Sequence, residues 1–234
     1  MTNQQFLTAI QHSFNEFVKC GTSRSTAKLK PLHGAIATDL AERLGDDYEI
    51  WSQGYGHDKE ALINGRYIDK KVDITVMKNG TAVAGLAVKF VMQNYSQNSN
   101  NYFENMLGET ANIRSNKVPY FQIFIILDRL PYYNKDKFIT KWETLTEHNI
   151  EKYIMLGKDD VQTFFHTPNK TLIEVVHVPG NDSIISQQEY MLYYRTKKFR
   201  LQESKSNYGN FGPAVILNNY TQFINKVYHT ILSQ

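Results

Sequence analysis

Hydrophobic residues recur every three or four positions in the first part of the chain, which predicts two amphipathic helices. The first should run from about Phe6 to Cys20 along an apolar stripe of Phe and Ile. A polar loop over 22–30 separates it from the second, which should follow Pro31 and stop at Gly45. The chain therefore begins with two helices that each need a partner surface for one face.

The pattern then changes to the alternation that is typical of strands. A short strand is expected over Tyr48–Trp51, followed by a surface loop over Gln53–Arg66 that is rich in Gly, His and charge. Apolar and polar residues alternate over Lys71–Met77, the pair Asn79-Gly80 signals a tight turn, and Thr81–Met92 is a long apolar run. These features predict two antiparallel strands joined as a β-hairpin.

Helical spacing returns after the hairpin and is followed by a fully apolar segment. Gln93–Asn101 is rich in Asn and Gln and is expected to be a polar connection, with a helix over about Tyr102–Arg114. Tyr120–Leu127 is almost wholly apolar, as expected of a central strand covered on both faces. Strand, helix and strand in this order predict a βαβ crossover.

The remaining third of the chain predicts further helices and one more strand. We expect a helix over Lys137–Glu147, a strand over Thr171–Val178, and a closing helix whose apolar stripe runs from Tyr220 to Ile231. The whole pattern predicts an α/β fold in which a mixed central β-sheet is flanked by helices on both faces.

Composition narrows the possible classes of protein. A chain of 234 residues is long enough for one domain, and a net charge of +3 with a pI of about 8.7 permits nucleic-acid binding without requiring it. Cys20 is the single cysteine, so neither an internal disulfide nor a cysteine-built zinc site can form. No run approaches the length of a membrane span and the first residues do not resemble a signal peptide, so we expect a cytoplasmic protein without a membrane partner.

The hairpin carries the residues with the clearest chemistry. Asp73 lies on its first strand and Lys89, sixteen residues later, on its second. Side chains alternate along a strand, so Ala87 and Lys89 should face the same way, and a twisted hairpin can bring Asp73 beside them. A carboxylate that holds Mg²⁺ and an ammonium that orients a water or a phosphate oxygen are what phosphodiester hydrolysis needs, and the carbonyl of Val88 could be a further metal ligand.

The segment Lys71-Val72-Asp73-Ile74, followed by Gly85-Leu86-Ala87-Val88-Lys89-Phe90, resembles the core of the PD-(D/E)XK nuclease superfamily, with Val72 where the family often has proline. The order of helix, hairpin, helix and central strand is also similar. The resemblance implies a single nuclease domain over 1–234, with a restriction-endonuclease-like catalytic core at about 31–130. The region 180–234 would then add DNA-binding or dimer surface. The implied activity is that of a type II restriction enzyme, a homodimer that cuts double-stranded DNA at a specific sequence with Mg²⁺. A repair or mobile-element nuclease, and a non-cleaving DNA-binding protein on a decayed nuclease fold, are the alternatives.

Ala87 departs from the family, because it stands where the second metal-binding acid is expected and alanine cannot bind a metal. Three explanations compete. An ancestral Glu was replaced by Ala; the acid moved to the following helix, with Glu104 as first candidate and Glu109 as reserve; or the motif arose by chance. The first accounts best for a segment that matches the family with one side chain removed. Glu42 is a further acid to consider, since some members present one from that helix.

Two polar regions are candidates for DNA contact, although amide-rich loops and charged edges are also common without any function. The amide-rich connection could read bases or touch phosphates through Asn94, Gln97, Asn98, Asn100 and Asn101. Later in the chain, tyrosines interleave with the basic residues Arg195, Lys197, Lys198 and Arg200.

Overall fold

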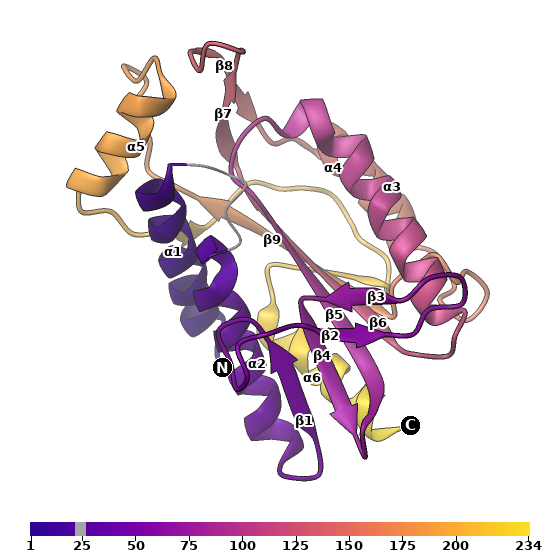
Figure 1. Ribbon diagram of the computed structural model, residues 1–234. Coiled ribbons are helices and arrows are strands. Elements are labelled where there is room, and N and C mark those ends of the chain that lie inside the picture. The colour runs from indigo at the N-terminus through magenta and orange to yellow at the C-terminus, as the bar shows by residue number, and fades with distance from the viewer. Residues whose placement is uncertain (22–26) are drawn as a thin grey trace.

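The computed structural model describes residues 1–21 and 27–234 and confirms the α/β class, with a mixed central sheet between helices (Figure 1). The central sheet has seven strands in the order β1-β4-β5-β6-β9-β10, and β11 also pairs with β9. Their bounds are β1 Glu49–Ser52, β4 Ile74–Lys78, β5 Thr81–Val91, β6 Tyr120–Leu127, β9 Lys170–His177, β10 Gln202–Glu203 and β11 Val215–Leu217.

Helices cover both faces of this sheet. On one side lie α1 (Asn3–Cys20), the short η1 (Ala27–Leu29), α2 (Lys30–Leu44) and α6 (Tyr220–Leu232), and on the other lie α3 (Tyr95–Arg114) and α4 (Glu147–Gly157). α5 (Gln187–Thr196) packs aromatic rings against α1, where Tyr194 meets Phe14 edge to face at 5.3 Å between ring centroids.

The predicted hairpin and crossover are confirmed. Asn79 and Gly80 have φ of 50° and 74°, the left-handed pair that a two-residue hairpin turn requires. β4 and β5 pair antiparallel, β5 and β6 pair parallel, and α3 makes the crossover between them. β6 is buried along its whole length, as the apolar run predicts. The helices ending at Gly21 and Gly45 and the closing helix are also confirmed.

Some expected boundaries are wrong. The strand expected over Lys71–Met77 is interrupted at Asp73, where β3 (Lys70–Val72) ends and β4 begins, and β3 pairs with β2 (Ala61–Ile63) inside the expected loop. Of the polar loop over 22–30, residues 22–26 lie outside the described part, and η1 and the start of α2 occupy the rest. Asp73 therefore lies between the small β2-β3 pair and the central sheet and belongs to neither β3 nor β4.

The amide-rich segment is helical, contrary to the expected connection, because α3 begins at Tyr95. Burial of Tyr95 and the carboxylate of Glu143, which accepts from the N–H groups of Tyr95 (2.7 Å) and Ser96 (3.2 Å), hold the helix start in place. Most of the Asn and Gln side chains lie on the solvent-facing side of α3, where no packing contact disfavours their being in a helix.

The helix expected over Lys137–Glu147 is also wrong, since most of that segment is β8 (Ile139–Thr144), paired antiparallel with β7 (Arg129–Tyr133). The guanidinium of Arg129 stacks on Trp142, 4.8 Å from its ring centroid, and this cross-strand contact together with the β-forming Ile, Thr and Trp outweighs the helical spacing.

Candidate active site

The second half of β5 has a partner on one side and an open edge on the other. The antiparallel register with β4 ends at the pair Ile74 and Leu86, whereas the parallel register with β6 continues to Val91. Gly85 donates its N–H to Pro119 on the β6 side, so odd-numbered residues of β5 bond to β6. The N–H and carbonyl of Val88 consequently face the edge that β4 has left.

Asp73 occupies this open edge. Its Oδ2 accepts a hydrogen bond of 2.7 Å from the N–H of Val88. The carbonyl of Val88 points to the same side of the strand, because both main-chain groups of a strand residue lie on one edge. The break between β3 and β4 thus places a carboxylate next to a main-chain oxygen.

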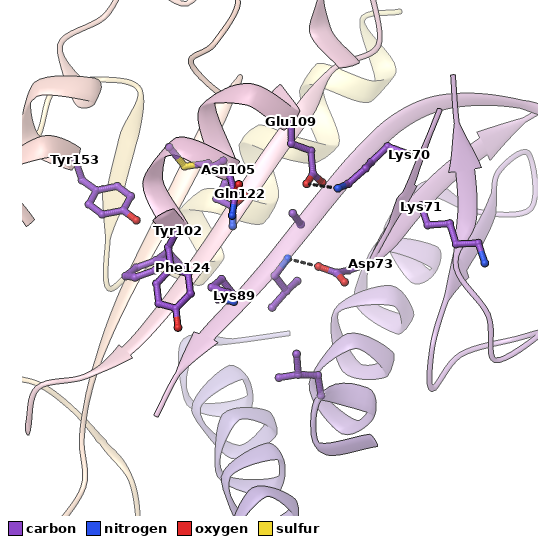
Figure 2. A pocket seen from close by; sticks show the side chains of 14 residues that line it. Lys70, Lys71, Asp73, Lys89, Tyr102, Asn105, Glu109, Gln122, Phe124 and Tyr153 are labelled. Carbon is purple, nitrogen blue, oxygen red and sulfur yellow. Dashed lines mark hydrogen bonds and ion pairs between the residues drawn. The ribbon is translucent and has the colours of Figure 1, made fainter. Parts of the chain in front are cut away.

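A cavity of about 380 Å³ lies over this edge, between β5 and α3 (Figure 2). Its lining includes three of the predicted site residues from the hairpin, Asp73, Ala87 and Lys89, together with Val88. The structure therefore brings the predicted Asp and Lys into one cavity. Ala87 contributes only a methyl group to the wall, and in register beside it on β6 is Gln122.

Of the two helix acids, Glu109 lines the cavity and Glu104 does not. Glu109 accepts a hydrogen bond from the buried Tyr120 hydroxyl and forms an ion pair with Lys70, whose Nζ lies 3.3 Å from Oε2. Glu104 is exposed on α3, near Lys152 of α4, and its charge opposes the lowering of the Lys152 pKa by burial. Glu42 is exposed on α2, away from the cavity lining.

The titration of Asp73 reflects a carboxylate taken out of water near a second one. Its pKa is raised to about 6, chiefly by burial and also by the negative charge of Glu109, while the hydrogen bond from Val88 lowers it. Lys89 and Lys70 act in the opposite direction. Burial lowers the pKa of Lys89, and the charge of Asp73 opposes this. The cavity therefore holds two mutually repelling carboxylates, Asp73 and Glu109, and an ammonium, Lys89, that interacts with the charge of Asp73.

This donor set fits a hard divalent cation. Two carboxylates and a main-chain carbonyl are oxygen ligands of the kind that Mg²⁺ prefers, and Mg²⁺ usually keeps several waters, so a few protein ligands suffice. Over residues 1–21 and 27–234 no group of three His, Cys, Asp or Glu side chains is close enough to hold a metal. Asp73, Glu109 and the Val88 carbonyl are thus the residues that could hold Mg²⁺ here.

Lys89 is placed by an aromatic ring. Its Nζ lies 4.2 Å from the ring centroid of Tyr102, a residue of α3 that also lines the cavity. The side chain is exposed along part of its length, so the ammonium can reach a bound anion.

The predicted amide contacts divide into two groups. Asn94, Gln97 and Asn98 line a polar groove next to the cavity, but the side chain of Asn94 is already bonded to the main chain of Tyr133, accepting at 2.9 Å and donating at 3.3 Å. Farther along α3, Asn100 accepts from Lys152 at 3.1 Å and Asn101 is exposed. Only the first group lies beside Lys89.

The predicted basic region lies on α5 and just after it, at the end of α1 (Figure 1). Arg195 donates to the carbonyls of Val18 (2.5 Å) and Lys19 (2.7 Å), so it caps the C-terminal turn of α1. The other three side chains, Lys197, Lys198 and Arg200, are exposed. Arg195 therefore stabilises the end of α1, whereas Lys197, Lys198 and Arg200 form a positively charged surface.

Sequence reasoning missed Lys70, Tyr102 and Gln122, which line the cavity, and Tyr120, whose hydroxyl bonds to Glu109. Lys70 directly precedes the motif, which was a usable signal. Tyr120 and Gln122 lie in an apolar strand whose contacts with α3 depend on how the helix docks, and no local pattern gives that.

Comparisons with protein-family models, with curated proteins and with solved structures found no match to this chain. Within the described ranges, no helix combines the length and the apolar character needed to cross a lipid bilayer.

Proposed function

We propose that this protein is a Mg²⁺-dependent endonuclease that acts on double-stranded DNA, of the type II restriction kind. One observation carries the proposal. Asp73, the open-edge main chain of Val88, Lys89 and Glu109 all line one cavity. A carboxylate pair next to an ammonium, at the open edge of a strand, suits hydrolysis of a phosphodiester.

Each of these residues has a distinct part in the proposed reaction. Asp73 and Glu109, with the carbonyl of Val88, would hold Mg²⁺, which when bound lowers the pKa of a water and neutralises charge on the phosphate. Lys89 orients the attacking water or a phosphate oxygen with its ammonium. Tyr120 and Lys70 fix the rotamer of Glu109 through their contacts with its two oxygens.

The alanine at position 87 allows two versions of the proposal, one in which the protein cuts DNA and one in which it only binds DNA. If Glu109 supplies the acid that Ala87 lacks, the protein cuts DNA as it stands. If the function depended on an acid at position 87, the protein binds DNA without cutting it. The electrostatic effect of Glu109 on Asp73 supports the first version, because the two carboxylates then face a common space.

Plasmid cleavage in Mg²⁺ by four proteins tests this proposal: the wild type, Glu109→Gln, Glu104→Gln and Ala87→Glu. We expect discrete fragments from the wild type, a loss of about a hundredfold or more in Glu109→Gln, since a metal ligand is removed, and near wild-type cleavage in Glu104→Gln. Cleavage by Ala87→Glu alone would instead assign the missing acid to position 87. If none of the four cuts, the endonuclease proposal fails.

The DNA would lie across the cavity and the groove beside it, where Gln97 and Asn98 can reach it. Binding as a homodimer, with the exposed Lys197, Lys198 and Arg200 touching phosphates, belongs to the same proposal and follows from the twofold symmetry of a palindromic site.

A further inference from the structure

The turn that joins β2 to β3, residues 64–69, carries two neighbouring apolar side chains that lie in solvent. Tyr67 is 78% exposed and Ile68 is 65% exposed, the highest fractions among the large hydrophobic side chains that the structure describes. A single exposed apolar residue is ordinary on a protein surface, whereas adjacent ones mark a surface that meets a partner. The pair therefore indicates a binding surface.

The main chain of this turn is held firmly although its side chains are exposed. Asn112, a buried residue of α3, accepts from the N–H groups of Tyr67 (2.9 Å) and Ile68 (3.3 Å) and donates to the carbonyl of Ile68 (2.8 Å). Its own carbonyl accepts from the N–H of Arg66 at 2.9 Å. Asn112 also lies so close to Gly65 that a Cβ at this position would overlap with its amide nitrogen. The turn is thus ordered in advance, which lowers the entropy that is lost when a partner binds.

The turn lies beside the candidate active site, next to the C-terminal end of α3 (Figure 1). β3 leads from it directly to Asp73, and Lys70 and Lys71 of β3 line the cavity. Ile68 is five positions before Asp73, so their Cα atoms are at most about 18 Å apart. This is the length of about five base pairs at about 3.4 Å each. A duplex with a phosphate in the cavity would therefore extend past the turn.

Charges around the turn favour a polyanion. Arg66 is exposed, and its guanidinium lies 5.8 Å from the ring centroid of Tyr67. Arg66 and the exposed Lys71 outnumber the single carboxylate of the turn, Asp69. A cation next to an exposed aromatic ring suits nucleic acid, because the ring can stack on a base while the cation contacts a phosphate.

We propose that Arg66, Tyr67 and Ile68 form a wedge that contacts DNA bases near the cut. Tyr67 stacks on a base, Ile68 inserts at the same base step, and Arg66 binds a neighbouring phosphate. The wedge adds a contact with bases, whereas the cavity meets a phosphate. The identity of the partner as DNA rests on the proposed function, and the exposed, anchored turn is a feature of the fold.

Binding in EDTA to a short DNA duplex, and to the same duplex with one central mismatch, tests the wedge apart from cleavage. Insertion must unstack a base step, and this costs least at a mismatch. We expect the wild type to prefer the mismatched duplex by about tenfold, Tyr67→Ala to lose this preference, and Tyr67→Phe to retain it. The control is Phe138→Ala in the turn between β7 and β8, an exposed aromatic side chain whose loss should leave the preference unchanged.

Salt separates the stacked ring from the cation. Each cation that contacts a phosphate adds about 0.9 to the slope of log affinity against log salt. We expect Arg66→Met to reduce this slope by about 0.9 and Tyr67→Ala to leave it unchanged. Thermal unfolding of Tyr67→Ala should match the wild type, because the side chain is exposed.

Several results would overturn the wedge. One is equal preference for the mismatch in wild type and Tyr67→Ala, even if the wild type cleaves DNA, and another is an equal loss in Phe138→Ala. A changed oligomeric state of Tyr67→Ala in sedimentation, with unchanged DNA affinity, would assign the turn to a second copy of the chain. No duplex binding at low salt overturns the wedge outright. A wild type that never cleaves but shows the Tyr67-dependent preference loses its proposed activity and keeps the wedge.

Discussion

Asp73, a half-buried residue, combines three properties. It interrupts a strand, accepts a main-chain hydrogen bond from the neighbouring strand, and titrates at about 6 because burial penalises its charge. The ordinary carboxyl value is 3.8. The folded state therefore binds the proton more tightly than the unfolded chain does, so ionising Asp73 at neutral pH costs stability, which is compatible with the cation-binding role proposed above.

We predict that Asp73→Asn is more stable than the wild type at pH 8 by roughly 1–2 kcal/mol, less than the approximately 3 kcal/mol of the full pKa difference because the group is partly exposed. The stability held by the Asp73 proton is present below 3.8 and lost as the pH rises through about 6, so the gain should vanish toward pH 4. Urea unfolding at the two pH values measures it. A variant that is equally destabilised at both would show that the carboxylate is a structural acceptor only.

At this scale the sequence predicts that Ala87 and Lys89 share one face of β5, because strand alternation depends on local spacing, but it does not predict the break in the strand at Asp73. It does not rank Glu104 and Glu109. The two lie five residues apart on one helix, and which of them faces the cavity depends on how α3 docks on β6, where Tyr120 takes up Glu109. That docking is set by tertiary packing.

Among the elements, α3 shows how a tertiary contact overrides composition. Its first turn contains Ser96 and Asn98, which favour turns and loops, and Asn94 before it has φ of 50°. Glu143, a nearly buried carboxylate on β8, satisfies the first N–H groups from a strand 48 residues away. The amide-rich stretch predicted as a connection is helical for this reason.

We predict that Glu143→Ala lowers the free energy of unfolding by about 1–2 kcal/mol, since the helix start loses both its acceptor and a favourable charge. Glu151→Ala removes an exposed carboxylate from α4 and should change it by less than about 0.5 kcal/mol. Denaturant unfolding compares them. Equal effects would mean that Glu143 does not hold the helix start.

In the whole molecule, the parallel strands β5, β6 and β9 form the centre of the sheet, with α1, α2 and α6 on one face and α3 and α4 on the other (Figure 1). The alternation of apolar strands and amphipathic helices was enough to predict this class, because burial on both faces leaves a clear mark in sequence. The hairpin β7-β8 and the start of α3 were not predictable, because each depends on a partner far along the chain. The candidate site lies at the open edge of β5 beneath α3. It therefore depends both on the sheet, which the sequence predicts, and on the position of α3, which it does not.

Cleavage of supercoiled plasmid by wild type and Asp73→Asn, purified in parallel and assayed with Mg²⁺ or with EDTA, tests the central claim most directly. Asp73→Asn also controls for contaminating nucleases. The account predicts discrete fragments from the wild type in Mg²⁺ only, and intact plasmid from Asp73→Asn. Equal cleavage by both proteins, or Mg²⁺-dependent cleavage by neither, would contradict it.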